Sequence, residues 1–262
     1  MREEETSAET DFGFQRVPER EKASLVRDVF DSVATRYDLM NDLMSGGIHR
    51  WWKAEMVRAL RPRPGQLLLD VGGGTGDVAL RALPHLVPKE GERRADVGDG
   101  GAVVCDPNEQ MLETGRARAI DGGILAGVEW IAGDAEALPF PDRSFDLYAI
   151  AFALRNVTRI EAALADARRV LKPGGRFICL EFSPAVSPLL QPLYDFYSFG
   201  FLPLLGQVVT GDRDAYVYLV ESIRRFPAQS RLAAMIREAG LERARFRNLT
   251  GGIVALHSAW RL

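Results

Sequence analysis

The fold of this chain is decided by the stretch Gln66-Leu67-Leu68-Leu69-Asp70-Val71-Gly72-Gly73-Gly74-Thr75-Gly76-Asp77. Its first half is a short, continuous apolar run, which is typical of a strand buried on both faces of a sheet. Its second half is a glycine-rich turn that opens a helical segment. Glycines allow a tight turn and let a ligand approach the backbone closely. The stretch therefore predicts an α/β sheet with a ligand at its first turn.

Downstream of this turn, apolar runs alternate with segments of helical periodicity. Such alternation is typical of a parallel sheet with helices on both sides. Near the carboxyl terminus two strand-like runs are separated by Thr250-Gly251, which predicts an antiparallel pair. The expected strands are 66–71, 102–105, 128–131, 145–150, 176–182, 242–248 and 252–259, and the expected helices include 108–119, 160–171 and 229–239.

The organisation of the chain indicates one domain with additions. Residues 1–20 are polar and are expected to form a flexible segment, and residues 21–262 are expected to form a single domain. Within it, helical spacing predicts N-terminal helices over 21–61. Polar, glycine-rich residues predict an exposed, mobile insertion at 88–101, and an apolar region interrupted by Pro and Gly spans 184–228.

Composition excludes several classes of protein. Hydrophobic residues make up 47% and charged residues 26%, so the chain can bury a large core and is not disordered. Its 33 basic and 36 acidic residues give a net charge of −3, which argues against non-specific nucleic-acid binding. Cys105 and Cys179 lie in apolar runs and are expected in the core, with a disulfide or a metal pair as the alternative. No metal-ligand spacing is present, so no metal is predicted.

Acidic residues lie at the ends of three successive expected strands, which places them along one crevice. Asp70 suits a ligand ammonium group, and Asp106 suits the two hydroxyls of a ribose. Asp134 can accept a hydrogen bond from an adenine amino group while Ala135 donates its backbone N–H. These features match S-adenosylmethionine better than NAD, because S-adenosylmethionine has no pyrophosphate. The alternatives are a glycine turn without a ligand and solvent-exposed acids at strand ends.

Longer motifs carry a family resemblance. Three of them look like the cofactor domain of class I methyltransferases, namely 70–77, 133–140 and 168–176. Three others resemble the ubiquinone/menaquinone C-methyltransferase family, namely 37–53, 155–158 and 171–183. The resemblance implies a class I, Rossmann-like sheet of seven strands with N-terminal helices and a helical substrate cap. It implies S-adenosylmethionine as co-substrate, bound by Asp70, Gly72, Gly74, Thr75, Asp106, Asp134 and Ala135.

Within this family, the residues at 211–212 and 218–227 and the insertion at 88–101 look most like the mitochondrial branch. That likeness implies C-methylation of 2-methoxy-6-polyprenyl-1,4-benzoquinol in ubiquinone biosynthesis. The alternatives are methylation of a demethylmenaquinol or related naphthoquinol, and a non-catalytic cofactor-binding scaffold. Ala151 and Ala153 depart from the Ser and Gly that the family often has there.

The resemblance also implies catalytic residues, which are Arg155, Asn156 and Tyr37. An arginine stays protonated in proteins, so it suits holding a phenolate or orienting a water better than taking a proton directly. The alternative for Arg155 is a structural pair with an acid. Tyr37 is expected to line the substrate cavity, and His49 is expected to be a packed or surface histidine rather than a base.

The expected partners follow from the same resemblance. They are a polyprenyl benzoquinol, other ubiquinone-biosynthesis proteins in a complex, a membrane contacted peripherally and a second copy in a homodimer. The expected location is the matrix side of the mitochondrial inner membrane, with the bacterial cytoplasm as the alternative. Residues 184–211 hold eleven large apolar side chains and one charge, Asp195. A polyprenyl tail, a membrane, a subunit interface or a cap packed on its own domain would each explain them.

Overall fold

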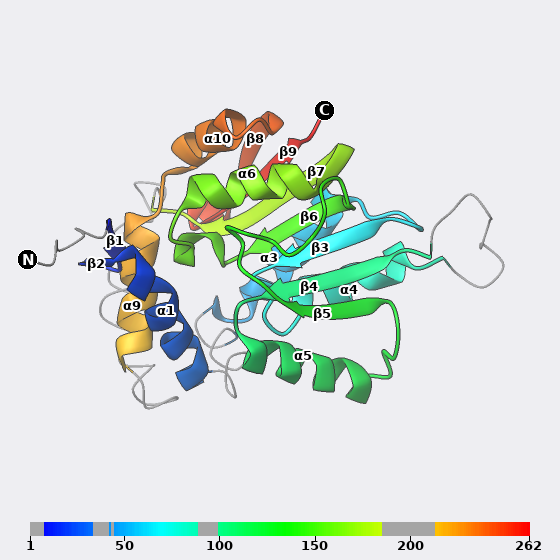
Figure 1. Ribbon diagram of the computed structural model, residues 1–262, viewed down its shortest axis with the longest axis horizontal. Helices are drawn as coiled ribbons and strands as arrows, with labels where there is room; N and C mark the ends of the chain where they lie inside the picture. Colours follow the sequence, from blue (N-terminus) through cyan, green and yellow to red (C-terminus); the bar gives the residue numbers. More distant parts are fainter. Residues whose placement is uncertain (1–7, 34–41, 43–44, 89–98, 185–212) are drawn as a thin grey trace, which may run out of the picture.

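A computed structural model of the protein describes residues 8–33, 42, 45–88, 99–184 and 213–262. Its centre is a seven-stranded sheet (Figure 1). Five neighbouring strands are parallel. The sixth strand runs antiparallel to the fifth, and the seventh, at the edge of the sheet, runs antiparallel to the sixth. In spatial order the strands are β5 (Val128–Ala132), β4 (Gly101–Asp106), β3 (Leu67–Val71), β6 (Phe145–Ala151), β7 (Leu171–Phe182), β9 (Val254–Trp260) and β8 (Glu242–Leu249).

Helices cover both faces of the sheet, as the alternating pattern predicts. Successive side chains of β3 point to opposite faces, so Leu68 packs in one apolar cluster while Leu69 and Val71 pack in the other. The helices on the Leu68 face are α3 (Ile48–Leu60), α4 (Asp77–Leu86) and α5 (Glu109–Asp121), and those on the other face are α6 (Ile160–Val170) and α10 (Gln229–Glu238). The expected strands and helices downstream of Gln66 are thus confirmed, and Cys105 and Cys179 are buried and free.

The amino-terminal residues differ from the expectation of a flexible segment over 1–20. Two strands, β1 (Glu9–Phe12) and β2 (Gln15–Pro18), form an antiparallel hairpin, and α1 (Glu19–Val33) begins directly after it. The hairpin and α1 both contact α9 (Arg213–Arg225), and α1 and α9 lie side by side in Figure 1. The stabilising partners are supplied by residues about 200 positions away, so local composition could not reveal them.

Several expectations fall on residues outside the described ranges. They are the mobility of residues 1–7, most of the 88–101 insertion (89–98), most of the apolar region (185–212), and the placement of Tyr37. Among the residues that are described, no helix has both the length and the hydrophobicity needed to cross a bilayer.

Candidate functional site

The glycine-rich turn joins β3 to α4 and leaves its backbone uncovered. Gly72 and Gly74 have φ values of 59° and 53°, a conformation that side chains with a Cβ rarely adopt. A Cβ on Gly72 would lie 2.3 Å from the Cβ of Ala153, and a Cβ on Gly74 would lie 3.1 Å from the Cε of Met111. The turn therefore needs glycine at both positions, and it offers a ligand bare backbone.

Asp106 ends β4 beside this turn, where the sequence predicted an acceptor for ribose. Its Oδ2 accepts a hydrogen bond from the Gly74 N–H at 2.9 Å, and its Oδ1 accepts one from the Asn108 N–H at 2.9 Å. Burial raises the pKa of Asp106 to about 6. Each carboxylate oxygen has a second lone pair. The carboxylate is thus held rigidly and can still accept hydrogen bonds from two ligand hydroxyls.

Asp134 lies just beyond β5, with Ala135 and Glu136 after it. The Asp134 Oδ1 accepts from the Glu136 N–H at 2.9 Å. The Glu136 carboxylate in turn accepts from the backbone N–H of Thr158 at 2.9 Å and pairs with Arg159 at 2.7 Å. These bonds tie the loop after β5 to the segment after β6. The position of the loop 134–136 is therefore fixed by hydrogen bonds within the protein.

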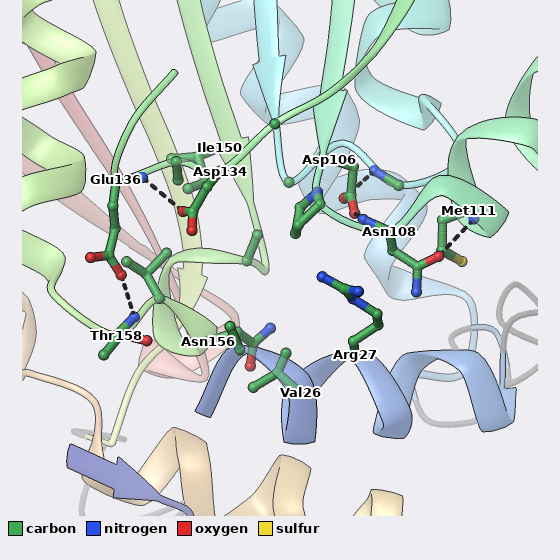
Figure 2. A pocket seen from close by; sticks show the side chains of 18 of the residues that line it. Val26, Arg27, Asp106, Asn108, Met111, Asp134, Glu136, Ile150, Asn156 and Thr158 are labelled. Carbon is green, nitrogen blue, oxygen red and sulfur yellow. Dashed lines mark hydrogen bonds between the residues drawn. The ribbon is translucent and has the colours of Figure 1, made fainter. Parts of the chain in front are cut away.

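A cavity of about 350 Å³ joins these features at the carboxyl ends of the strands (Figure 2). Its roof comes from α1, which contributes Ala23, Val26 and Arg27. Of the described lining residues, Arg27 alone carries a positive charge, and Figure 2 shows its side chain reaching into the cavity. The remaining walls are Gly72, Gly74, Asp106, Pro107, Asn108, Met111, Gly133, Asp134, Ala135, Glu136, Ile150, Phe152, Ala153, Asn156, Val157 and Thr158.

Five of the seven expected cofactor residues line this cavity, and Asp70 and Thr75 do not. Asp70 is buried, and its Oδ2 accepts from the Ala79 N–H in the first turn of α4 at 3.0 Å. Its Oδ1 has no hydrogen-bond partner within the described part of the chain, and burial raises the pKa of Asp70 to about 7. Thr75 packs its backbone against Gly115 of α5. Asp70 therefore braces α4 through its Oδ2, and neither Asp70 nor Thr75 lies on the described cavity wall.

The two catalytic candidates after β6 face different surroundings. Asn156 lines the cavity, whereas Arg155 is not one of its lining residues. The Arg155 Nη1 lies 2.7 Å from the Glu181 Oε1 and donates to the Phe152 carbonyl at 2.6 Å. Arg155 thus forms a pair with an acid, Glu181, as the alternative interpretation of this residue expected. Tyr37, the third candidate, lies outside the described residues.

His49 is buried, and its Nε2 lies 2.8 Å from the Asp42 Oδ1. Hydrogen bonds from Arg50 and from His49 lower the pKa of Asp42 to about 2. His49 does not line the described cavity, which agrees with the interpretation of a packed histidine.

Sequence reasoning missed the roof residues of α1 and one residue behind Asn156. Tyr218 of α9 donates from its hydroxyl to the Asn156 Oδ1 at 3.1 Å. No local pattern marks these residues, because their place depends on how α1 and α9 pack over the sheet. The helical spacing within 21–61 predicted N-terminal helices but not which side of α1 covers a ligand.

The residues present fit S-adenosylmethionine. The cavity volume is within the roughly 300–1,000 Å³ range of small-molecule sites. Glycine backbone, a rigid acceptor at the end of β4 and a polar loop after β5 stand in one row, as an amino-acid tail, a ribose and an adenine require.

Comparisons with known proteins agree with this geometry. Residues 17–261 match the model of the ubiE/COQ5 methyltransferase family. The "Ubiquinone/menaquinone biosynthesis C-methyltransferase UbiE" of Paracoccus denitrificans is 57% identical, over 97% of each chain. The mitochondrial "2-methoxy-6-polyprenyl-1,4-benzoquinol methylase" of Danio rerio is 52% identical, over 97% of this chain and 84% of its own length.

Among solved structures, a SAM-dependent methyltransferase from Aquifex aeolicus superposes with a TM-score of 0.56 at 15% identity. It covers 80% of this chain, and the match covers 89% of the Aquifex chain. This likeness supports the class I fold and not a substrate. The match to the family model and the near full-length relatives lead to the conclusion that the chain belongs to the ubiE/COQ5 methyltransferase family and is an S-adenosylmethionine-dependent C-methyltransferase.

Proposed function

We propose that this protein methylates a ring carbon of a polyprenyl benzoquinol, 2-methoxy-6-polyprenyl-1,4-benzoquinol, in ubiquinone biosynthesis. The observation that carries the proposal is the identity of about half or more, over nearly the whole chain, to two relatives. One is named for ubiquinone/menaquinone biosynthesis and the other for methylation of this benzoquinol. The relatives include bacterial and mitochondrial enzymes at similar identity. The likeness to the mitochondrial branch therefore does not distinguish the matrix from a bacterial cytoplasm.

The cofactor contacts follow from the cavity. When bound, S-adenosylmethionine supplies a methyl group on a sulfonium, which is an electrophile. Asp106 is positioned to accept hydrogen bonds from the two ribose hydroxyls, and Gly72 and Gly74 leave room for the cofactor against the backbone. Asp134 and Ala135 stand at the place proposed for the adenine. We assign Asp70 and Thr75 to support of the turn rather than to direct contact.

The protein's part in the chemistry is to position the quinol and to favour its ionised form. A ring carbon becomes a nucleophile when a neighbouring hydroxyl loses its proton and the negative charge spreads into the ring. Asn156 is the candidate on the cavity wall, and its amide can donate a hydrogen bond to the developing phenolate. Arg155, paired with Glu181, holds the short helix η2 (Leu154–Asn156) that carries Asn156. We therefore assign Arg155 a positioning role.

A second substrate has a specific observation behind it. The Paracoccus relative is named for both ubiquinone and menaquinone biosynthesis, so a demethylmenaquinol is the alternative acceptor.

A polyprenyl tail would be drawn from a membrane, which favours peripheral membrane contact. From the family resemblance we also propose that the protein forms a homodimer and joins a complex with other ubiquinone-biosynthesis proteins.

The test is turnover with defined acceptors. Purified protein, methyl-labelled S-adenosylmethionine and chemically reduced quinones with short prenyl tails are incubated, and the products are identified by mass spectrometry. We expect methylation of a ring carbon of the methoxybenzoquinol. Asp106→Ala is the matched control, and it should methylate more slowly when S-adenosylmethionine is not saturating. Methylation of the naphthoquinol alone would establish the alternative. Cofactor binding without methylation of either quinol would indicate a scaffold and contradict the proposal.

A further inference from the structure

The contact behind Asn156 joins two distant parts of the chain. The Tyr218 hydroxyl donates to the Asn156 Oδ1 at 3.1 Å, across 62 positions of sequence. Tyr218 is buried, and its burial raises the pKa of the phenol to about 12. The hydroxyl therefore keeps its proton at neutral pH, and in the structure it donates a hydrogen bond to the amide oxygen.

This hydrogen bond is made by one of the two orientations of the amide, the one in which the oxygen faces Tyr218. An asparagine side chain has a carbonyl acceptor on one side and an NH₂ donor on the other. With the oxygen held by Tyr218, the NH₂ group faces the opposite way, and Figure 2 shows the Asn156 nitrogen toward the cavity. Within the described part of the chain, the Asn156 side chain forms no other hydrogen bond. Its two N–H donors are thus available to an acceptor in the cavity.

Tyr218 is itself anchored by the amino-terminal hairpin. Its ring stacks on Phe12, with 4.4 Å between ring centroids and an interplanar angle of 23°. One turn along α9, Glu221 accepts a hydrogen bond from the Phe14 N–H at 3.0 Å. Two contacts one helical turn apart fix α9 against the hairpin, so Tyr218 cannot easily withdraw from Asn156.

We propose that Tyr218 is a positioning residue which holds the Asn156 amide with its N–H groups toward the cavity, where they donate to the quinol oxygen. In the opposite orientation the amide carbonyl would face the developing phenolate and repel it. The inference rests on the proposed quinol methylation and extends it. It gives α9 and the hairpin, which lie outside the sheet, a part in orienting the site.

The experiment compares Tyr218→Phe, Asn156→Ala and the double variant in quinol turnover. Tyr218→Phe keeps the ring that stacks on Phe12 and removes only the donor. A neutral hydrogen bond is worth enough for about a tenfold effect, so we expect kcat to fall about tenfold while KM for S-adenosylmethionine stays within twofold. In the Asn156→Ala background the same substitution should cause no further loss, because the amide to be oriented is gone.

The matched control is Tyr148→Phe, which removes a buried tyrosine hydroxyl from the core, where the ring stacks on Phe177. We expect it to leave kcat unchanged. An equal loss from Tyr218→Phe in both backgrounds would overturn the inference, since Tyr218 would then act independently of Asn156. An unchanged kcat in the single variant would overturn it as well.

A second variant covers the case in which Tyr218→Phe fails to fold. Asn156→Asp preserves shape and still accepts from Tyr218, but presents an oxygen to the cavity. We expect more than a tenfold fall in kcat with cofactor binding retained, and wild-type turnover would contradict the inference. If the wild-type protein binds cofactor and methylates no quinol, the proposed function falls and the inference falls with it. Normal wild-type turnover with an unaffected Tyr218→Phe overturns the inference alone.

Discussion

Arg155 and Glu181 form a buried ion pair between η2 and β7. The Arg155 Nη1 lies 2.7 Å from the Glu181 Oε1, and the side chains are 6% and 1% exposed. The second Glu181 oxygen accepts from the Arg155 backbone N–H at 3.3 Å, so both ends of the carboxylate hold the same residue. The pair fixes the segment that carries Asn156. Breaking it should therefore affect folding as well as turnover.

Arg155→Ala should destabilise the fold by about 3–5 kcal/mol, because it leaves the Glu181 carboxylate buried without its partner. Chemical denaturation of the variant measures this loss. The double variant Arg155→Ala, Glu181→Ala should recover part of the stability, since it removes the unpaired charge. A single variant as stable as the wild type, with kcat lowered, would instead place Arg155 in direct contact with the reacting quinol.

Asp106→Ala should weaken the binding of S-adenosylmethionine by about one to two orders of magnitude, roughly the worth of two hydrogen bonds to a charged acceptor. Isothermal titration calorimetry with S-adenosylhomocysteine gives the same comparison without turnover. Asp121→Ala, at the exposed end of α5, is the matched loss of a carboxylate and should bind normally. Unchanged affinity in folded Asp106→Ala would remove Asp106 from the site.

Asp70 should make the protein less stable as the pH rises from about 4 to 7. Its pKa is about 7 in the folded protein and near 3.8 when unfolded, so the folded state holds the proton through that interval. Stability falls with pH wherever the folded state binds more protons, here by up to about 4 kcal/mol. Denaturation curves at several pH values measure the slope. Asp70→Asn should reduce it, whereas the part that comes from the raised pKa of Asp106 should remain. An identical slope in Asp70→Asn would show that Asp70 does not keep its proton in the folded protein.

Gly72→Ala should abolish cofactor binding and lower the thermal midpoint, because the new Cβ would lie 2.3 Å from Ala153 in a left-handed backbone conformation. Gly174→Ala is the matched control. Gly174 has a φ of 82°, and a Cβ there would meet nothing within 4 Å. Gly174→Ala therefore adds backbone strain without a clash, and the difference between the two variants measures the effect of the clash with Ala153. Equal effects at both positions would show that the close approach to Ala153 is unimportant.

The positions of the strands along the chain and the edge of the sheet that carries the acidic residues are encoded locally in the sequence. Continuous apolar runs such as 67–71 specify strands buried on both faces, and alternation with helices makes the sheet parallel. Parallel strands end at one edge, so Asp106 and Asp134 had to come together beside Gly72 and Gly74. This much follows from periodicity and position in the motif.

Tertiary structure alone decided what each polar side chain at that edge faces. Asp70 is the last residue but one of β3 and Asp106 is the last residue of β4, yet Asp70 bonds to α4 while Asp106 lines the cavity. Arg155 and Asn156 are neighbours in sequence, yet one pairs with Glu181 and the other faces the cavity against Tyr218. The hairpin and the α1 roof likewise depend on contacts with α9, about 200 residues away. Local patterns set backbone periodicity and burial, whereas the direction of a buried polar group depends on which distant partner satisfies its hydrogen bonds.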